Sequence, residues 1–343
     1  MTATLTPAIT LETVTRVLAE HAEETERGAR LAPASVEALR AAGLFALGLA
    51  QADGGASVSE LFDTLTELGG ACPASAWVTG TGAVSKRFAA LGFGPDTAAS
   101  LIAPDDLACG SGHPQGQLIG NGGGEVRLEG RWRWISGCQI AKVAVLGAST
   151  PGEDPKLNAA IVPLDAIRIE PDWDVAGMRG TGSHAVVADG VTVAPTHHAP
   201  ASFTASFAIF SAVAAAAPVL GAAAGALALA RDRIGDSATP RALALEATQR
   251  VDDALLIARA VADEADQLGA SAQMPDMTRL RSRLGRAVKI ALSAFDPILD
   301  LHGASGFRAQ QPVQRLWRDA TVAARHPLIL SAAIDEHRSE QLL

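Results

Sequence analysis

The sequence has few of the features that would place a chain in a membrane or outside the cell. It has 343 residues, 48% of them hydrophobic, yet no run of about 18 uninterrupted apolar residues occurs. The most apolar stretch, residues 208–230, is rich in alanine and glycine and contains Pro218, so we expect a buried or interface helix rather than a membrane span. No basic segment followed by an apolar core appears near the N-terminus, so no export signal is predicted. We expect a cytoplasmic protein.

Cysteine and clustered positive charge are also scarce. The three cysteines, Cys72, Cys109 and Cys138, lie far apart without Cys-x-x-Cys spacing, which argues against a disulfide framework and a zinc site. The adjacent pair His197 and His198 has no third ligand nearby in the sequence, so we predict no metal site there. The net charge is −9 and no basic run occurs, which argues against nucleic-acid binding.

What the sequence does contain is a β-rich segment between two helical segments. Residues 106–202 hold short runs of strand-forming residues separated by Gly, Pro and Asp turns, which predict a small antiparallel barrel or sandwich. Helical periodicity covers the rest, with the final two helices predicted over residues 277–301 and 313–337. We therefore predict an α+β protein with three domains, at residues 1–105, 106–202 and 203–343. The many small residues of the last domain favour close helix contacts between subunits, so we expect a dimer or tetramer.

This order of segments, together with several motifs, resembles the acyl-CoA dehydrogenase superfamily. The motifs keep their order along nearly the whole chain: Asp53-Gly-Gly55, Ala74-Ser-Ala-Trp-Val78, Trp173-Asp-Val-Ala-Gly-Met-Arg-Gly-Thr-Gly-Ser183, Leu301-His-Gly-Ala-Ser-Gly-Phe307 and Gln314-Arg-Leu-Trp-Arg-Asp319. The resemblance implies an N-terminal helical domain, a central antiparallel β-barrel domain and a C-terminal up-down helix bundle.

Two departures from the dehydrogenase pattern are informative. Dehydrogenases of this superfamily commonly carry a catalytic glutamate shortly after the Arg-Asp motif, whereas this chain has His326 there. The segment Gly110–Gly116, which includes His113, replaces the pattern that lies over the flavin. Both features resemble the two-component (group D) flavin-dependent monooxygenases. That resemblance implies an oxygenase component that takes reduced FMN or FAD from a separate flavin reductase and reacts it with molecular oxygen. The resulting C4a-hydroperoxyflavin would hydroxylate a small aromatic, polyketide-like or heteroatom substrate.

The resemblance also implies roles for residues that would touch the substrate. His326 would be the base that deprotonates a phenol, since imidazole titrates near neutrality. His113 would orient the substrate or the peroxide. Ser136, with the adjacent Gly137, would hold the proton on flavin N5 by a hydrogen bond in a pocket that excludes water.

A second set of residues is predicted to hold the flavin itself. Thr181, Gly182 and Ser183 would contact the isoalloxazine ring or the phosphate region, and Arg233, near a helix end, would bind phosphate.

Two alternatives stay open at this stage. The first is a dehydrogenase-type flavin oxidoreductase with a relocated base, for which Glu246 or Asp296 would be the candidates, although neither lies in a matching motif. The second is a non-catalytic homologue that kept the fold and lost the cofactor. The second alternative predicts no saturable binding of reduced FMN or FAD.

Overall fold

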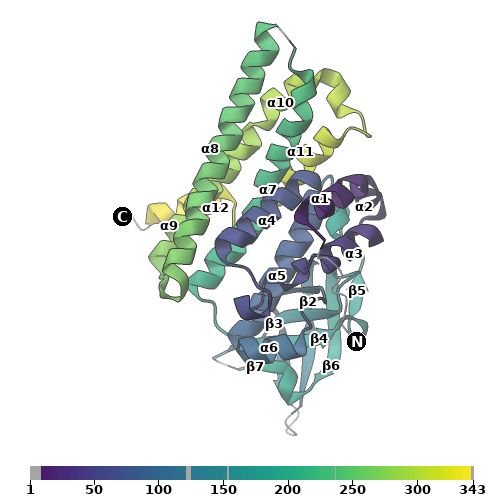
Figure 1. Ribbon diagram of the computed structural model, residues 1–343. Coiled ribbons are helices and arrows are strands. Elements are labelled where there is room, and N and C mark those ends of the chain that lie inside the picture. The colour runs from purple at the N-terminus through teal and green to yellow at the C-terminus, as the bar shows by residue number, and fades with distance from the viewer. Residues whose placement is uncertain (1–8, 121–124, 153, 236, 341–343) are drawn as a thin grey trace, which may run out of the picture.

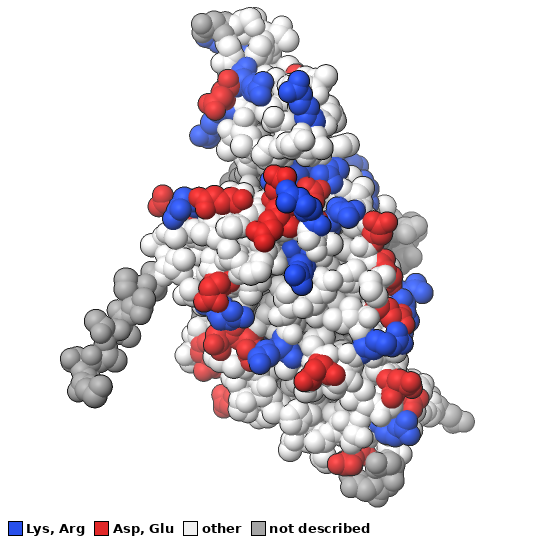
Figure 2. Space-filling model, turned by 90° about the vertical axis from the view of Figure 1, so that its right-hand side faces the viewer, with Lys and Arg blue, Asp and Glu red and all other residues white. Residues whose placement is uncertain are grey.

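The computed structural model describes residues 9–120, 125–152, 154–235 and 237–340. It has the predicted α+β architecture: along the chain, helical segments come before and after one sheet. Figure 1 shows the long C-terminal helices in the upper half, the sheet in the lower half and the N-terminal helices between them. Figure 2 shows acidic and basic side chains interspersed over one face, without a broad field of a single sign.

The N-terminal part is helical. Its α-helices are α1 (Leu11–Glu20), α2 (Ala22–Gly28), α3 (Pro33–Ala41), α4 (Val58–Ala71), α5 (Pro73–Phe93) and α6 (Pro95–Leu101). A capping box starts α4, because Ser57 accepts from the Glu60 backbone while the Glu60 side chain accepts from the Ser57 backbone. Most residues of α5 are buried, and this helix carries Trp77 into the interior between the sheet and the C-terminal helices.

A seven-stranded sheet follows. Its strands are β1 (Ala108–Gly120), β2 (Val126–Ile135), β3 (Val143–Ser149), β4 (Leu157–Pro163), β5 (Arg168–Glu170), β6 (His184–Val193) and β7 (His198–Pro200), in the order β5-β6-β2-β1-β3-β4-β7. All neighbouring pairs are antiparallel except β1 and β3, which are parallel. Alternation of apolar and polar residues indicates strands, but it does not indicate which strands pair or in which direction. The sequence therefore did not predict that β1 and β3 are parallel.

The C-terminal part is again helical. Its α-helices are α7 (Ala205–Ala230), α8 (Ala238–Leu268), α9 (Met274–Ser293), α10 (Phe295–His302), α11 (Pro312–Ala323) and α12 (Ser331–Glu340). One sheet between two helical regions matches the predicted fold class, whereas the division into domains at residues 105 and 202 stays a prediction.

Two of the helices predicted as continuous are each divided into two. The helix expected over residues 313–337 is broken between α11 and α12, and the helix expected over 277–301 divides at Ala294. Pro327 explains the first break, because proline has no backbone N–H and disfavours helical geometry in the residue before it, His326. The break therefore places His326 in a connecting segment instead of on a helix face.

Helix α7 is the core of the C-terminal region. Together with the turn that follows it, Ala205–Arg233, it is long and apolar enough to cross a membrane by length and composition. However, 89% of its most apolar window is buried inside the fold, as the sequence predicts for this stretch. A helix that is apolar on all sides is a core helix when other elements cover it.

Glycines let α7 approach α4 closely. A Cβ atom added at Gly221 would lie 2.1 Å from the carbonyl oxygen of Thr66, and one at Gly225 would lie 2.2 Å from that of Gly70. Both neighbours are backbone atoms, so they cannot move aside as a flexible side chain would. The contact therefore requires residues without a side chain at these positions.

We expect the substitution Gly221→Ala to lower the free energy of unfolding by about 3 kcal/mol, since overpacking forces the two backbones apart. Gly235→Ala is the matched control, because no atom lies within 4 Å of its added Cβ. Denaturant unfolding of both variants measures the effect. Equal midpoints for Gly221→Ala and the wild type would show that the helices do not cross as closely as described.

Candidate active site

Three predicted residues form a buried cluster where the sheet meets the helices. Ser136 follows β2, and Thr181 and Ser183 precede β6. The Oγ atoms of Ser136 and Ser183 are 2.8 Å apart, and Ser183 Oγ lies 2.6 Å from Thr181 Oγ1. Their exposed fractions are only 7%, 3% and 1%. We call these three side chains the hydroxyl cluster.

The two predicted glycines join the segments that carry the cluster. Gly137 donates its backbone N–H to the carbonyl oxygen of Thr181 at 2.8 Å, which ties the end of β2 to the segment before β6. Gly137 has a φ of 75° and Gly182 a φ of 50°, in the left-handed region that favours glycine. These glycines therefore shape the backbone around the hydroxyls.

Residues of helix α11 hold the segment before β6 in place. Asp319 Oδ1 accepts a 2.5 Å hydrogen bond from the backbone N–H of Met178, which has a left-handed φ of 57°. Arg318 donates to the carbonyl oxygen of Ala176. A Cβ atom at Gly177 would lie 2.3 Å from the Arg318 carbonyl oxygen, so only glycine fits there. The Arg-Asp motif thus holds the cluster-bearing segment against the helices.

Burial raises the pKa of Asp319 to about 7. The folded protein then keeps this carboxyl protonated at pH values where the unfolded chain has lost the proton. The stabilising contribution is therefore complete below about pH 4 and is lost as the pH rises through about 7.

We expect Asp319→Asn, which keeps an acceptor for the Met178 N–H, to remove this pH dependence. Relative to the wild type, the variant should gain stability between pH 5 and pH 8, as measured by denaturant unfolding at each pH. Taking the difference between the two proteins cancels the titration of all other groups. A difference that does not vary with pH would contradict the raised pKa.

His326 lies beside the hydroxyl cluster, linked to it through Trp77. Trp77 Nε1 donates to Ser136 Oγ at 3.1 Å, and the rings of Trp77 and His326 meet edge to face with centroids 5.5 Å apart. Nδ1 of His326 lies 3.3 Å from the backbone N of Leu328. Burial, reinforced by the positive charge of Arg281, lowers the pKa of His326 to about 4. The imidazole is therefore neutral at pH 7, with a lower pKa than the near-neutral value that the sequence suggested.

A cavity of about 520 Å³ adjoins the His326 segment. It is lined mostly by apolar side chains: Phe203, Thr204, Ala208, Met274, Met277, Thr278, Arg281 and Ile334. We call it the apolar cavity. Arg281 forms the link to His326, because its guanidinium donates to the carbonyl oxygens of Pro327, at 3.2 Å, and Leu328, at 3.3 Å.

Arg281 is unusual among the side chains that line the apolar cavity. It is half-buried, and burial lowers its pKa. Within the described part of the chain it has no acidic partner; its contacts are the two carbonyl oxygens and the sulfur of Met277. A partly desolvated cation without a counter-ion makes the cavity favourable for an anionic or electron-rich oxygen.

His113 lies in β1, near the Phe203 side of the apolar cavity. Its side chain is exposed, and the pairing of β1 with β3 shifts register between Ser111 and Gly116. The ring of Phe203, which lines the cavity, packs against Gly112, where an added Cβ would meet it at 2.9 Å. Gly112, the residue before His113, thus contacts a side chain that lines the cavity, while among the described residues no hydrogen bond or ring contact joins His113 to His326.

Arg233 does not join the hydroxyl cluster. It ends the short turn after α7 and is exposed. Burial lowers the pKa of His302, and the positive charge of Arg233 lowers it further. Within one chain, a phosphate bound by Arg233 would therefore lie away from Ser136.

Neither alternative base lies at the site. Glu246, on α8, forms an ion pair with Arg250 one turn further along that helix. Asp296 is exposed in the first turn of α10. Neither residue lines the apolar cavity. The geometry therefore gives no support to a relocated carboxylate base.

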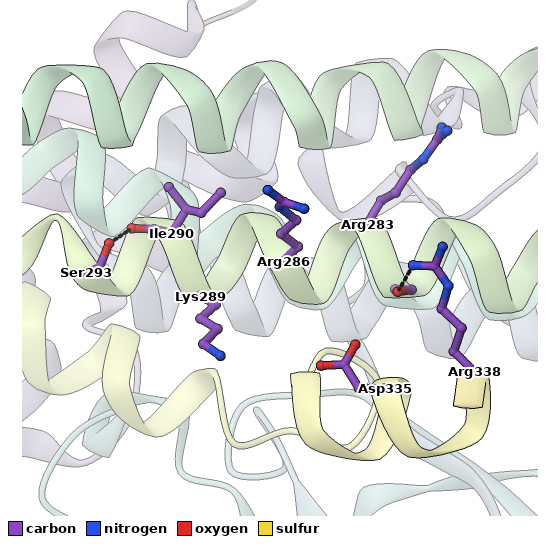
Figure 3. Close-up of a pocket in the computed structure, with 8 residues that line it drawn as sticks. Arg283, Arg286, Lys289, Ile290, Ser293, Asp335 and Arg338 are labelled. Atoms are coloured by element: carbon purple, nitrogen blue, oxygen red, sulfur yellow. Dashed lines mark hydrogen bonds between the residues drawn. The ribbon is translucent and has the colours of Figure 1, made fainter. Parts of the chain in front are cut away.

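A second hollow, of about 700 Å³, lies between α9 and α12. Figure 3 shows Arg286 and Lys289 extending from α9, with Asp335 and Arg338 on α12. Its lining is predominantly cationic and includes none of the predicted site residues. This hollow is therefore separate from the residues predicted to touch flavin or substrate.

Comparison with known proteins agrees with this geometry. Residues 213–330 match the family model described as acyl-CoA dehydrogenase, C-terminal domain. The chain is 32% identical to the oxygenase component of an FADH(2)-dependent resorcinol hydroxylase from Rhizobium sp. (strain MTP-10005), over 89% of this chain and 86% of that protein. It is 28% identical to the flavin-dependent monooxygenase oxygenase subunit HsaA of Rhodococcus jostii (strain RHA1), over 92% of each chain.

A solved structure shows the same fold. XiaF from Streptomyces sp., in complex with FADH2 and glycerol, superposes with a TM-score of 0.88 at 25% identity, covering 97% of this chain and 93% of that one. The chain therefore belongs to the acyl-CoA dehydrogenase superfamily, in its branch of two-component flavin-dependent monooxygenases. It is an enzyme of that kind, the oxygenase component, and it depends on a flavin.

Proposed function

We propose that this oxygenase hydroxylates a small aromatic compound with an ionisable hydroxyl group, using reduced FAD from a separate flavin reductase. The observation that carries the proposal is Arg281, a half-buried guanidinium that lines the apolar cavity next to the His326 segment and has no acidic partner among the residues that the structure describes. The relative named as a resorcinol hydroxylase supports the substrate class. That relative's FADH(2) dependence and the FADH2 complex of XiaF favour FAD over FMN.

The residues around Trp77 suit a reduced flavin. Ser136 offers a buried hydroxyl oxygen next to Trp77, and the cavity near His326 is lined mostly by apolar side chains. When bound, the reduced flavin supplies the activation of molecular oxygen. In this proposal Ser136 accepts a hydrogen bond from flavin N5–H, and the neighbouring Gly137, Gly182 and Thr181 shape the backbone that receives the ring.

His326 and Arg281 act on the substrate hydroxyl. The neutral imidazole accepts the phenolic proton at Nδ1, which gives up its 3.3 Å hydrogen bond from the Leu328 backbone N–H, and the guanidinium offsets the charge that develops on the oxygen. An anionic oxygen beside His326 raises the imidazole pKa from its resting value of about 4, so proton transfer becomes easier once the substrate is in place. His113, which follows the residue that packs against Phe203, orients the substrate.

We further propose that the enzyme is a cytoplasmic homo-oligomer, a dimer or a tetramer. Arg233 is predicted to contact phosphate, yet within one chain it lies apart from the hydroxyl cluster, beside His302. A neighbouring copy that supplies Arg233 to the flavin phosphates would reconcile the two observations.

The experiment that tests the substrate class compares a phenol with its methyl ether. We expect the wild-type enzyme to bind the phenol more tightly, and Arg281→Leu to weaken phenol binding by about 10- to 100-fold, the value of a hydrogen bond to a charged group. Binding of the ether should change little. Arg286→Leu, on the groove side of the same helix, is the matched control. Equal weakening of both ligands would mean that Arg281 does not recognise the hydroxyl.

A further inference from the structure

We propose that a buried relay of hydrogen bonds fixes the Ser136 hydroxyl as an acceptor, so that the site favours reduced over oxidised flavin. The inference rests on the function proposed above, in which Ser136 meets flavin N5. The relay is defined by its members: Trp77, Ser136, Ser183, Thr181 and the carbonyl oxygen of Met178. In it Trp77, Ser183 and Thr181 are positioning residues, since they act through Ser136.

The direction of every hydrogen bond follows from the last member. Thr181 Oγ1 lies 2.8 Å from the carbonyl oxygen of Met178, and a carbonyl can only accept, so the single hydroxyl proton of Thr181 is used there. The 2.6 Å contact between Thr181 and Ser183 must then use the proton of Ser183. The 2.8 Å contact between Ser183 and Ser136 must in turn use the proton of Ser136.

The first member completes the assignment. Indole N–H can only donate, so Trp77 Nε1, at 3.1 Å, takes one lone pair of Ser136 Oγ. Ser136 then has no proton left to offer, and one acceptor position remains on its oxygen. The chain of donors and acceptors therefore runs in one direction, from the indole to the Met178 carbonyl.

Burial prevents the relay from reversing. Ser136, Ser183 and Thr181 are 7%, 3% and 1% exposed, so bulk water cannot supply alternative donors or acceptors at these oxygens. Reversing one bond would leave the oxygens of Thr181 and Met178 2.8 Å apart with no proton between them, and would place two protons between one pair of hydroxyl oxygens. The Met178 carbonyl also accepts from Trp173 Nε1 and from the Thr181 backbone N–H, so the close approach of oxygen lone pairs is what opposes reversal, and it is costly at buried oxygens.

The consequence depends on the oxidation state of the flavin. In reduced flavin N5 bears a hydrogen and donates, which matches the free acceptor position on Ser136. In oxidised flavin N5 carries a lone pair and would face the oxygen of Ser136 without a proton between them. The relay therefore selects the form that a separate reductase delivers and disfavours the spent form.

The test measures affinity and not turnover. Reduced and oxidised FAD are titrated anaerobically into the wild type, Thr181→Val and Thr181→Ser. We expect the wild type to prefer reduced FAD. Thr181→Val removes the end of the relay and frees a proton for Ser136, so the preference should fall by about threefold to tenfold, the value of one hydrogen bond. Thr181→Ser keeps the hydroxyl and should restore the preference.

A second variant covers the case in which Thr181→Val fails to fold. Ser183→Ala removes the acceptor of the Ser136 proton and frees that proton for flavin N5, so it should also reduce the preference. Ser149→Ala, which removes a serine hydroxyl outside the cluster, is the control and should leave it unchanged. Saturable binding of reduced FAD with the same preference in all variants would overturn the relay but leave the proposed function in place. Absence of reduced-FAD binding to the wild type would overturn both.

Discussion

The substitution His326→Ala is expected to lower the rate of hydroxylation by about 10²- to 10⁴-fold at saturating reduced flavin, the usual contribution of a positioned acid–base group. The ring is the only imidazole shown to contact Trp77 among the described residues, and it adjoins the cavity through Arg281. Removing it leaves the phenolic proton without an acceptor. Product formation in single turnovers, started from preformed reduced enzyme, measures the effect.

The control for this prediction is His197→Ala, which removes an imidazole that contacts the Thr196 hydroxyl, away from the site. Binding of reduced flavin to His326→Ala should stay close to the wild type, because the hydroxyl cluster is intact. A hydroxylation rate that is unchanged in His326→Ala would show that the base lies elsewhere.

The substitution Ser136→Ala is expected to divert oxygen from product to hydrogen peroxide. It removes the acceptor proposed for flavin N5–H and leaves the buried Trp77 N–H without its partner. The yield of hydroxylated product per oxygen consumed should fall by roughly tenfold, corresponding to the loss of about one buried hydrogen bond. Simultaneous measurement of product, oxygen and peroxide gives the yield.

Ser149→Ala provides the matched control for Ser136→Ala. Ser149 is a partly buried serine of the same sheet whose hydroxyl donates to the Gly116 carbonyl oxygen, outside the cluster. It should keep the wild-type yield. If Ser136→Ala also keeps that yield, Ser136 does not protect the flavin.

The sequence singled out residues that the fold brings together on the sheet side of the candidate site. Ser136, Gly137 and the segment Thr181–Ser183 belong to motifs with distinct residue types, and the fold brings them within hydrogen-bonding distance of one another. Glycine and serine at strand ends indicate turns. The local sequence therefore predicts much of the backbone shape around these residues.

The helix side was harder to predict. The apolar period continues across residues 313–337, which hid the break at Pro327 that frees His326 from a helix. Trp77 lies in the motif Ala74-Ser-Ala-Trp-Val78, but the sequence gives it no role at the site, and nothing in the sequence singles out Arg281. Their importance comes from contacts with residues far away in the chain, Ser136 for Trp77 and Pro327 for Arg281. Such contacts depend on how the helices pack against one another. The spacing of apolar residues along one helix does not predict that packing.

The most direct test of the account is a crystal structure of the anaerobic complex with reduced FAD. The account predicts flavin N5 within hydrogen-bonding distance of Ser136 Oγ, with the ring edge open to the cavity between Phe203 and Arg281. A flavin bound elsewhere, or one with a glutamate and not His326 beside its reactive face, would contradict it.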